Sequence, residues 1–371
     1  MSKIAFIAAS PVTIKAFLMP FVNELKKNHQ MHLIANFEDE LDYSVIPKGV
    51  IVHQVKINRN PTVFSDLLAL IQLIKLIYTE SFDLVHSFTP KAGLLAQIAA
   101  FICRTKNRYH TFTGQVWATK TGLKRYFLKK MDCIIAHLST HHFVDSISQR
   151  NFLLVNKVTS EKKSSVLGHG SISGVNLDKF KFSQHSRSQL RESLGLNDDV
   201  FIFLYAGRLK IDKGIPELFT AFDNISKTND CRLVIVGHDE EQLLSKIENN
   251  NKVIFCGFSD DIPAYFSMAD VLCLPSHREG FGNVIIEAAA CGLPSLGSDI
   301  YGLSDAISHN KTGLLHKVAD VQDLENKMLQ LYSDRELLHT YAINSTKRVH
   351  KLFSENLIVS EFVSFYKLHN L

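Results

Sequence analysis

The sequence predicts an α/β fold of two domains, each built on a parallel β-sheet with helices on both faces. Short apolar runs alternate with helical patterns through the first half of the 371-residue chain, and the second half repeats this alternation. A polar stretch, 182–199, separates the halves and contains few large apolar residues. Such alternation is typical of parallel sheets whose strands are buried on both faces. A chain of this length can form two separate cores.

The expected strands are the apolar runs, and helices of about 10 to 18 residues fit between most of them. In the first half the expected strands are 4–9, 31–35, 50–55, 83–86, 107–111, 133–136 and 165–168. In the second half they are 201–206, 233–236, 253–256, 271–274 and 294–296. Three helical patterns, 321–333, 335–352 and 355–368, close the chain.

Composition places the chain among ordinary soluble globular proteins, with 46% hydrophobic and 21% charged residues. The apolar stretches 67–78 and 94–103 are too short to span a bilayer. Residues 1–9 fit a first strand better than a signal peptide, so we expect a cytoplasmic protein. The six cysteines form no C-x-x-C pair. We therefore expect reduced core cysteines, and neither disulfides nor a zinc site.

The loop after the first strand argues against one common cofactor class. It reads Ala-Ala-Ser-Pro-Val-Thr over 8–13 and contains no glycine. A nicotinamide or flavin bound through G-x-G-x-x-G is therefore not expected. Ser10 and Thr13 can instead cap the following helix.

Two cations follow the expected strand 201–206. The sequence there is Gly-Arg-Leu-Lys-Ile-Asp-Lys-Gly over 207–214. Arg208 lies at the carboxyl end of the strand, the edge where open α/β sheets bind ligands, and Lys213 precedes a helix start. Fixed cations at that edge can hold a diphosphate leaving group and stabilise the charge that it gains.

The segment 275–298 combines a phosphate seat with two carboxylates. A loop, Gly280-Phe281-Gly282, follows the expected strand 271–274 and leads into a helix from about Asn283. Free N–H groups and the helix dipole favour phosphate there. Glu279 and Glu287 bracket this seat and are suited to accept hydrogen bonds from sugar hydroxyls. The arrangement fits a nucleotide-sugar.

The Glu279 to Glu287 spacing around Gly-Phe-Gly, together with Gly-Arg-Leu and Lys-Gly over 207–214, closely resembles the motifs of the family 4 retaining glycosyltransferases. The resemblance covers nearly the whole chain and is strongest over 200–315. It implies the GT-B fold, with two Rossmann-like domains facing across a cleft. The implied domains are an N-terminal acceptor-side domain, 1–183, a nucleotide-sugar-binding domain, 184–352, and a C-terminal helix, 353–371, that crosses back to the first domain.

The resemblance also implies roles for individual residues. Arg208, Lys213 and Glu279 would act in catalysis, the cations on the departing diphosphate and Glu279 on the transferred sugar. Glu287 would hold the ribose. The remaining implied donor contacts come from three loops: Gly170 and Ser171 against the phosphate, backbone near Gly257 and Phe258 against the base, and Gly280, Phe281, Gly282 and Asn283 at the helix start.

The first domain departs from the family pattern at one position. Family members often have a histidine before the glycine that follows the expected strand 107–111, and this histidine contacts the transferred sugar. Here Thr113 stands before Gly114. Either Thr113 takes that position or His110 reaches in from three residues earlier. Trp117, the single tryptophan, either lines the acceptor cleft or fills the core.

The implied activity is transfer of a hexosyl or N-acetylhexosaminyl group, with retention, from a UDP-linked nucleotide-sugar to a lipid-linked or glycan acceptor. The implied pathway is bacterial surface polysaccharide synthesis, as in lipopolysaccharide O-antigen, capsule or exopolysaccharide. No Asp-x-Asp occurs in the sequence, so no cofactor and no essential metal ion are expected. A UDP-sugar 2-epimerase of the same fold and a non-catalytic nucleotide-sugar-binding scaffold are the alternatives.

Charge is uneven along the chain. Residues 1–183 carry a net charge of +11 and residues 184–371 one of −7, which gives the total of +4. Lysine and arginine alternate with large apolar residues over 119–130, a pattern typical of helices that lie on an anionic membrane face. A solvated helix with a buried apolar stripe is the alternative. We expect peripheral association with the inner membrane from the cytoplasmic side, and no nucleic acid partner.

Overall fold

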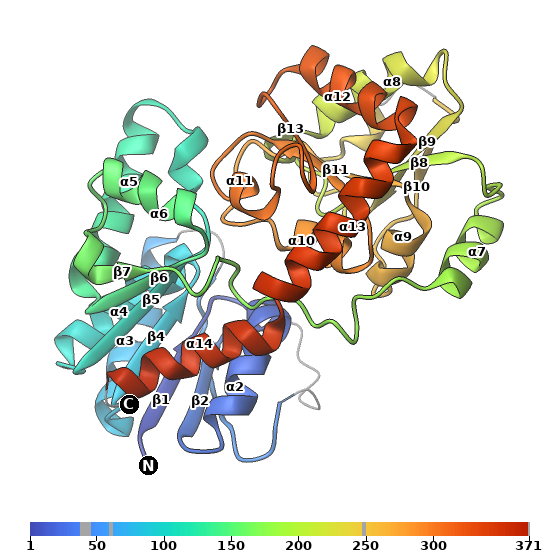
Figure 1. The fold of residues 1–371 in the computed structure, drawn as a ribbon. Helices are drawn as coiled ribbons and strands as arrows, with labels where there is room; N and C mark the ends of the chain where they lie inside the picture. The colour runs from blue at the N-terminus through green and yellow to red at the C-terminus, as the bar shows by residue number, and fades with distance from the viewer. Residues whose placement is uncertain (38–45, 59–61, 247–249, 370–371) are drawn as a thin grey trace. The chain divides into compact units, whose positions relative to one another are not determined.

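The computed structural model describes residues 1–37, 46–58, 62–246 and 250–369 (Figure 1). Residues 370–371, at the end of the expected C-terminal segment, lie outside this set. The chain divides into two compact units. The first unit contains Met1–Ser173 and Glu355–Leu371, and the second contains Gly174–Ser354. Each unit is described by itself.

The first unit is built on a parallel sheet of seven strands in the order β3-β2-β1-β4-β5-β6-β7. In register, Ile4 of β1 lies opposite Met31 of β2 on one side and Leu84 of β4 on the other. The apolar runs form the buried strands because both faces of the sheet are covered. The strands are β1 (Lys3–Ile7), β2 (Gln30–Ala35), β3 (Ile51–Gln54), β4 (Leu84–Phe88), β5 (Asn107–Phe112), β6 (His141–Val144) and β7 (Ser164–Ser165).

Helices cover both faces of this sheet. One face carries α3 (Val63–Glu80), α4 (Pro90–Ile102), α5 (Gly122–Leu138) and α6 (Ile147–Val155). The other face carries α1 (Pro11–Thr13), the π-helical turn Ile14–Leu18, α2 (Met19–Leu25) and α14 (Glu355–Leu368). Two short 3-10 turns, Val116–Thr119 and Glu161–Lys163, complete the unit.

The last helix, α14, belongs to the first unit although it follows the whole of the second in sequence (Figure 1). Phe362 and Tyr366 of α14 are buried in one core cluster with Phe6 and Phe21. The Tyr366 hydroxyl lies 2.6 Å from Nδ1 of the fully buried His86. Aromatic packing and this buried hydrogen bond therefore fix the end of the chain on the first sheet.

The second unit contains a parallel sheet of six strands in the order β10-β9-β8-β11-β12-β13. The strands are β8 (Phe201–Ala206), β9 (Cys231–Val236), β10 (Val253–Phe255), β11 (Val271–Leu274), β12 (Ser295–Ser298) and β13 (Gly313–His316). The helices are α7 (Gln184–Ser193), α8 (Ile215–Ser226), α9 (Ile262–Met268), α10 (Asn283–Ala290), α11 (Leu303–Ala306), α12 (Val321–Ser333) and α13 (Arg335–Leu352), with 3-10 turns at Ile211–Lys213 and Leu244–Lys246.

One expected strand is wrong. Residues 133–136 lie inside α5, and the sixth strand of the first sheet is His141–Val144 instead. The run Cys-Ile-Ile-Ala over 133–136 is part of an amphipathic helix, in which Ile135 and Ala136 are buried and Ile134 is 44% exposed. The strand itself begins with two histidines, whose polar character hides a buried strand from a hydrophobicity pattern.

The expected boundary at 183/184 is also wrong, since the second unit begins at Gly174. Val175 donates its N–H to the carbonyl of Phe353 (2.8 Å) and is itself buried in the core of the second unit. The stretch before residue 184 is therefore already packed on the second sheet.

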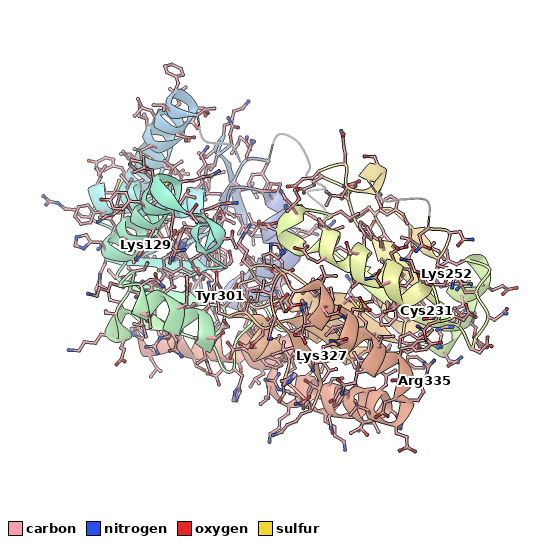
Figure 2. The ribbon with its side chains drawn as sticks, turned by 90° about the horizontal axis from the view of Figure 1, so that it is seen from above. Lys129, Cys231, Lys252, Tyr301, Lys327 and Arg335 are labelled. Atoms are coloured by element: carbon pink, nitrogen blue, oxygen red, sulfur yellow. The ribbon has the colours of Figure 1, made fainter. Side chains whose placement is uncertain are left out.

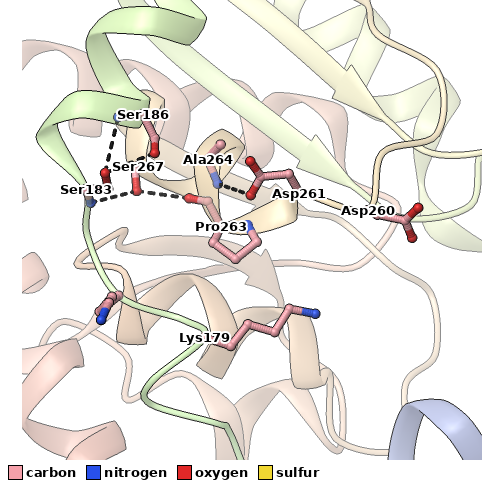
Figure 3. A pocket seen from close by; sticks show the side chains of 9 residues that line it. Lys179, Ser183, Ser186, Asp260, Asp261, Pro263, Ala264 and Ser267 are labelled. Atoms are coloured by element: carbon pink, nitrogen blue, oxygen red, sulfur yellow. Dashed lines mark hydrogen bonds between the residues drawn. The ribbon is translucent and has the colours of Figure 1, made fainter. Parts of the chain in front are cut away.

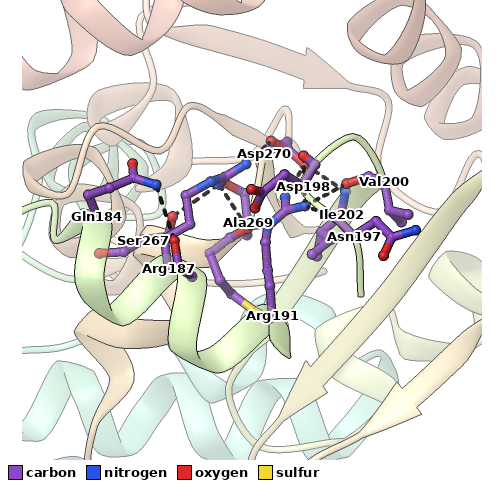
Figure 4. A network of polar contacts seen from close by, with 12 residues as sticks. Gln184, Arg187, Arg191, Asn197, Asp198, Val200, Ile202, Ser267, Ala269 and Asp270 are labelled. Carbon is purple, nitrogen blue, oxygen red and sulfur yellow. Dashed lines mark hydrogen bonds and ion pairs between the residues drawn. The ribbon is translucent and has the colours of Figure 1, made fainter. Parts of the chain in front are cut away.

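A buried arginine explains why the polar stretch 182–199 is part of the second unit and not a free linker (Figure 4). Arg191 on α7 is 1% exposed, and its guanidinium donates to the carbonyl oxygens of Met268 and Val200 (2.9 Å each). It also pairs with Asp270 at 3.0 Å, and the carboxylate of Asp270 accepts the N–H of Ile202. A buried cation is tolerated because its donors are satisfied.

The six cysteines are free, as expected. Cys231 on β9, which is labelled in Figure 2, is fully buried, and so is Cys273 on β11. Burial raises the pKa of the Cys231 thiol to about 11. These thiols therefore stay protonated and act as small apolar core groups at neutral pH.

Candidate functional site

The strand order of the second sheet reverses between β8 and β11. Chain order runs outward from β8 through β9 to β10 on one side, and from β11 through β12 to β13 on the other. At such a switch point the loops beyond the carboxyl ends diverge and leave room for a ligand. The loops 207–214 and 275–282 follow β8 and β11 here. They are the two segments that the sequence patterns selected.

Two ion pairs join these two loops, and a third contact joins the second loop to the first turn of α8. Nζ of Lys213 lies 2.5 Å from Oε1 of Glu279. The pairs Arg278 with Asp212 and His277 with Glu217 are each 2.9 Å long. The structure thus brings together Lys213 and Glu279, which are 66 positions apart in sequence.

Glu279 is held from a second side as well. The hydroxyl of the fully buried Ser276 donates to Oε1 of Glu279 at 2.9 Å. The side chains of Lys213 and Glu279 are only 19% and 16% exposed, so solvent screens their attraction less than on an open surface. An ammonium group has three N–H donors. One points to Glu279, and the others can reach a phosphate.

Glycines allow the close approach of these loops. Gly214 has a φ of 71°, and a Cβ there would lie 2.0 Å from the carbonyl oxygen of Pro275. Gly302, with a φ of 86°, packs in the same way against the carbonyl of Gly280, which a Cβ would meet at 2.6 Å. No other residue type fits either position without moving backbone.

Arg208 forms an ion pair with a residue outside these two loops. Its Nη1 lies 3.2 Å from Oε1 of Glu240, in the loop after β9, and its side chain is 44% exposed. Lys210 also binds Glu240 at 3.2 Å. Burial works to raise the pKa of Glu240, but Lys210 and Arg208 together hold that pKa below its ordinary value. The structure therefore does not pair Arg208 with Glu279, and Glu240 is a residue that the sequence patterns missed.

Asp212 is a second missed residue. Burial favours a raised pKa here too, but Arg278 and then Lys213 hold the pKa of Asp212 below its ordinary value. Its carboxylate therefore remains ionised at neutral pH. Together with Lys213, Arg278 and Glu279 it forms a network of alternating positive and negative charges along both loops. The Lys-Ile-Asp-Lys sequence showed the charge but not its partner, which lies 66 positions away in Arg278.

The start of α10 agrees with the expected phosphate seat in its backbone. Gly282 precedes the helix with a φ of 85°, and Asn283 is its first residue. The expected contact from Phe281 stays a prediction for its backbone, because the ring is 2% exposed and packs on Phe353 with centroids 5.2 Å apart. Phe281 anchors the loop on the core, and its aromatic character serves packing.

Glu287 lies one turn into α10 and is half-buried. Burial raises the pKa of Glu287 to about 7, and the nearby ammonium of Lys179 works against this rise. Among the residues that the structure describes, none hydrogen-bonds its carboxyl group. A carboxyl in this condition is available to a ligand hydroxyl as acceptor and, when protonated, as donor.

The loop after β10 carries the residues expected near the base. The N–H of Gly237 donates to the carbonyl of Gly257 (2.8 Å), which joins the loops after β9 and β10. Phe258 is 59% exposed, and its ring stacks on His238 with centroids 4.7 Å apart. This exposed pair of flat rings lies at the same carboxyl edge as Arg208.

Beside this edge lies a hollow of about 430 Å³ between the segment 179–186 and α9 (Figure 3). Lys179, Lys181, Asp260 and Asp261 line it together with Ser183, Ser186, Pro263, Ala264 and Ser267. The serines are committed to each other and to backbone, as in the 3.1 Å bond from the Ser183 N–H to Ser267 Oγ. The hollow therefore presents mixed charges and no single ligand preference.

In the first unit, the two alternatives for the sugar contact differ in burial. The ring of His110 is 1% exposed, lies 2.9 Å from Ser87 Oγ and packs so tightly over Gly93 of α4 that a Cβ there would overlap it. Burial lowers the pKa of His110 to about 3, so its ring is neutral at pH 7. Thr113 follows β5 at its carboxyl end and is half-buried. A sugar contact from either residue stays a prediction.

Gly170 and Ser171 belong to the first unit, so their expected contact with the donor phosphate stays a prediction. Gly170 has a φ of 113° and donates its N–H to the carbonyl of Leu167. Ser171 has a φ of 78°, which is rare for a residue with a side chain, and donates its N–H to the carbonyl of Asp145 at 2.7 Å. Asp145 is buried at the carboxyl end of β6 and was missed.

Trp117 fills the core. It is 1% exposed, and its indole N–H donates to Asp132 at 2.7 Å. Burial raises the pKa of Asp132 to about 7 although that hydrogen bond lowers it. The guanidinium of Arg125 lies over the indole at 5.0 Å, and Lys129, labelled in Figure 2, lies at 5.7 Å. Two of the cations in 119–130 are thus engaged with Trp117.

Three large apolar residues in the N-terminal half of the same helix are not buried. Leu123, Tyr126 and Phe127 are 75%, 55% and 62% exposed, beside exposed Lys124 and Lys130. The expected alternative, a solvated helix with a buried apolar stripe, does not describe this part of α5. Within the described ranges, no helix has the length and apolar character needed to cross a membrane. Over the same ranges, no three His, Cys, Asp or Glu side chains are grouped to bind a metal ion.

Comparisons with known proteins agree with this geometry. A family described as glycosyl transferases group 1 matches residues 186–348, and one described as glycosyl transferase 4-like matches residues 3–138. The capsular polysaccharide biosynthesis glycosyltransferase CapM of Staphylococcus aureus is 34% identical over 349 residues, covering 92% of this chain and 90% of that protein.

A second relative and a solved structure extend the comparison. The UDP-Gal:α-D-GlcNAc-diphosphoundecaprenol α-1,3-galactosyltransferase of Escherichia coli is 28% identical over 291 residues, covering 75% of this chain and 74% of that protein. The crystal structure of Anabaena HepE with UDP-glucose superposes with a TM-score of 0.81 at 20% identity and covers each chain fully. This likeness confirms the expected GT-B architecture.

Proposed function

The chain belongs to the glycosyl transferases of group 1, and from that premise we propose that its second unit binds a UDP-linked sugar and passes the sugar, with retention, to a lipid-linked acceptor. The observation that carries the proposal is the 2.5 Å pair of Lys213 and Glu279 at the switch point of the second sheet. It supplies a cation for the diphosphate beside a carboxylate for sugar hydroxyls. The nucleotides in the names of the relatives support UDP.

Charge placement supports a definite division of roles. Lys213 would steady the diphosphate as the glycosidic bond breaks, because a preorganised cation stabilises charge that develops in the transition state. Arg208 would join it by exchanging Glu240 for the phosphate. Glu279, already held by Ser276, would orient the transferred sugar, and Glu287 would hold the ribose. The departing diphosphate would take the proton of the acceptor hydroxyl on the same face, which is consistent with retention.

The E. coli relative acts on a diphosphoundecaprenol-linked sugar, as its name states. We extend this acceptor class, a sugar on a lipid diphosphate, to the present chain. The relatives and matching families described above are glycosyltransferases, so the epimerase alternative has no support from them. The biological setting would be synthesis of capsule or a related surface polysaccharide.

A two-step experiment tests the donor and the reaction. Unfolding temperatures are first measured with UDP-, GDP- and TDP-sugars, since a ligand at a hundred times its Kd adds about 2.7 kcal/mol of stability. The best donor is then incubated with and without a short-chain GlcNAc-diphosphate lipid. We expect a UDP-sugar to stabilise the protein and the labelled sugar to move only when the lipid is present. Turnover of the donor alone to an epimer would contradict transfer.

Substitution separates a transferase from a scaffold. Glu279→Ala should abolish transfer, and Glu325→Ala, which removes a surface carboxylate on α12, should leave it unchanged. Both variants should keep the unfolding temperature of the unmodified chain within a few degrees. Undiminished transfer by Glu279→Ala would overturn the role of that carboxylate.

For localisation, we propose that the exposed apolar and basic face of the first unit rests on an anionic membrane. The N-terminal half of α5 supplies Leu123, Tyr126 and Phe127 beside Lys124 and Lys130. α4 packs next to α5, and α3 next to α4. The outer side of α3 continues the apolar surface with Val63, Phe64, Leu67, Leu68, Ile71 and Tyr78, which are 48% to 91% exposed. Such a surface suits lipid contact.

Vesicle sedimentation tests this attachment. The protein should bind phosphatidylglycerol vesicles and not phosphatidylcholine vesicles, and added salt should weaken binding. Phe127→Asp should reduce binding, and Ile343→Asp, at an exposed apolar position of the second unit, should not. Equal binding by both variants would contradict attachment through this face.

A further inference from the structure

Unpartnered polar atoms gather at the carboxyl edge of the first sheet. Oδ1 of Asp145, Nε2 of Gln115 and Oε1 of Gln149 are each buried without a hydrogen-bond partner. The three side chains are 6%, 0% and 0% exposed. Buried polar atoms in folded proteins almost always bind protein, water or ligand. Gln115 follows β5, Asp145 follows β6 and Gln149 lies on α6, so three such atoms at one edge of the sheet indicate a recognition site.

Backbone and side-chain bonds hold these three residues together. The N–H of Asp145 donates to the carbonyl of Phe112 at 3.3 Å, so the ends of β5 and β6 lie side by side. Nε2 of Gln149 donates to the same carbonyl at 3.3 Å and to Oε1 of Gln115 at 3.0 Å. Ser171 donates its N–H to the carbonyl of Asp145. The cluster is fixed before any ligand arrives.

Backbone strain marks the same edge. Among the described residues of the first unit, five that are not glycine have a positive φ. Three of them, Ser81, Arg104 and Lys157, come just after helices, where a left-handed residue often ends the helix. The other two follow strands at this edge. They are Thr89, with a φ of 68° and a buried Oγ1 without a partner, and Ser171, with a φ of 78°. Strain of this kind concentrates at ligand sites.

The chemistry of the free atoms selects the ligand class. The cluster offers an unpartnered amide N–H donor together with unpartnered oxygens, which suits neither phosphate, needing donors only, nor a metal cation, needing acceptors only. Burial raises the pKa of Asp145 well above its ordinary value, which favours the neutral acid over the carboxylate. A sugar hydroxyl or acetamido group both donates and accepts, and it carries no charge.

We propose that Gln115, Asp145 and Gln149 form a recognition site for a hydroxyl or acetamido group of the acceptor sugar, with Thr113 at its entrance. This inference rests on the proposed function, which places the charged donor on the second unit and leaves the neutral acceptor sugar to the first. Asp145 and Gln115 are then specificity-determining residues, because an acceptor that lacks the matching group would leave buried polar atoms unpaired.

Ligand-observed saturation-transfer NMR tests the site, with the short-chain GlcNAc-diphosphate lipid as the probe. Asp145→Ala and Gln115→Ala should each weaken probe binding about tenfold, as loss of one buried hydrogen bond does. Asp83→Ala is the matched control, since Asp83 precedes β4 at the opposite end of the same sheet and binds the N–H of Lys3. Fluorescence of Trp117, which lies in the first unit, and stabilisation by UDP should be equal in all four proteins, which shows that both units are folded.

Steady-state kinetics gives a second readout. The KM for the lipid acceptor should rise in the Asp145 and Gln115 variants, and the KM for the donor should not. Two results would overturn the inference and assign the free atoms to buried water. They are unchanged probe affinity in both variants, and no saturation transfer from the unmodified protein to the probe. Probe binding that depends on Asp145 in a protein without transfer activity would instead leave the site standing and refute the proposed function.

Discussion

The carboxyl edges of the two sheets differ in how they handle charge. The edge of the second sheet carries a network of ion pairs. They are Lys213 with Glu279, Arg278 with Asp212, and Arg208 with Glu240. At the corresponding edge of the first sheet, the proposed recognition site and its neighbour His110 are buried. The residues are a histidine whose pKa burial lowers, two glutamines and a carboxyl group whose pKa burial raises.

Two similar scaffolds can thus be prepared for opposite ligands. Fixed ions cost little when the ligand brings compensating charge, as a diphosphate does, because they are already oriented when the leaving group becomes negative. A neutral sugar is better recognised by donors and acceptors without net charge, since these reject a ligand that cannot satisfy them. The difference supports the proposal that the donor binds the second unit and the acceptor the first.

The largest expected effect is on the cation of the second edge. Lys213→Ala should lower kcat for transfer on the order of a hundred-fold or more. Lys210→Ala is the control, because Lys210 binds Glu240 and Glu241 outside the motif and should change kcat by less than about threefold. Equal losses of kcat in the two variants would show that the network of ion pairs affects transfer only through its total charge.

The next effect concerns the backbone that brings the two loops together. Gly214→Ala should destabilise the second unit by more than about 3 kcal/mol, from left-handed strain and from the clash with Pro275. Gly195→Ala has a similar φ, 66°, but no atom within 4 Å, and should cost only about 1 kcal/mol. Urea denaturation measures both values, and equal values would mean that close packing of the loops is not needed.

Acidification should unfold the two units at different pH values. Burial lowers the pKa of seven histidines in the first unit, and His316 is the one such histidine of the described second unit. A lowered pKa means that stability is complete above the unfolded value near 6.5 and is lost as pH falls toward the folded value. The seven are His29, His32 (about 4), His53, His86, His110 (about 3), His141 (about 4) and His142 (about 3).

The first unit should therefore unfold at a higher pH than the second during titration from pH 7 to pH 4. Asp132 and Asp145, whose pKa values are raised, oppose this trend but are outnumbered. Fluorescence of Trp117 reports on the first unit alone, since the chain has one tryptophan. Calorimetry reports on both. Coincident transitions by the two methods would contradict the prediction.

The smallest expected effect is that of metal removal. Lys213 and the start of α10 supply the positive charge for the diphosphate, and the sequence has no Asp-x-Asp. Transfer activity should persist in excess EDTA. Complete loss of activity that magnesium restores would refute this expectation.

Local patterns were enough to predict much of the second unit. β8 and β11 are apolar runs, each followed by glycine-containing loops, and parallel neighbouring strands bring the ends of such runs to one edge. That is why Lys213 and Glu279 could be selected without coordinates. The partner of Arg208 could not, because Glu240 comes from a third loop and only tertiary packing sets which carboxylate is in reach.

The first unit was harder to predict because its buried groups look polar. His141 and His142 begin a buried strand, and Asp145 resembles an exposed helix cap until Phe112 and Ser171 are seen to enclose it. Phe281 shows the opposite case, because its aromatic ring belongs to a predicted ligand loop but packs inward on Phe353. Burial by distant segments is the information that a single sequence lacks.

The most direct measurement of the division between the two edges is calorimetric titration of UDP into the unmodified protein, Lys213→Ala and Asp145→Ala. The account predicts at least tenfold weaker UDP binding in Lys213→Ala and unchanged binding in Asp145→Ala. Weakening by Asp145→Ala to the same extent, or full affinity in Lys213→Ala, would contradict it.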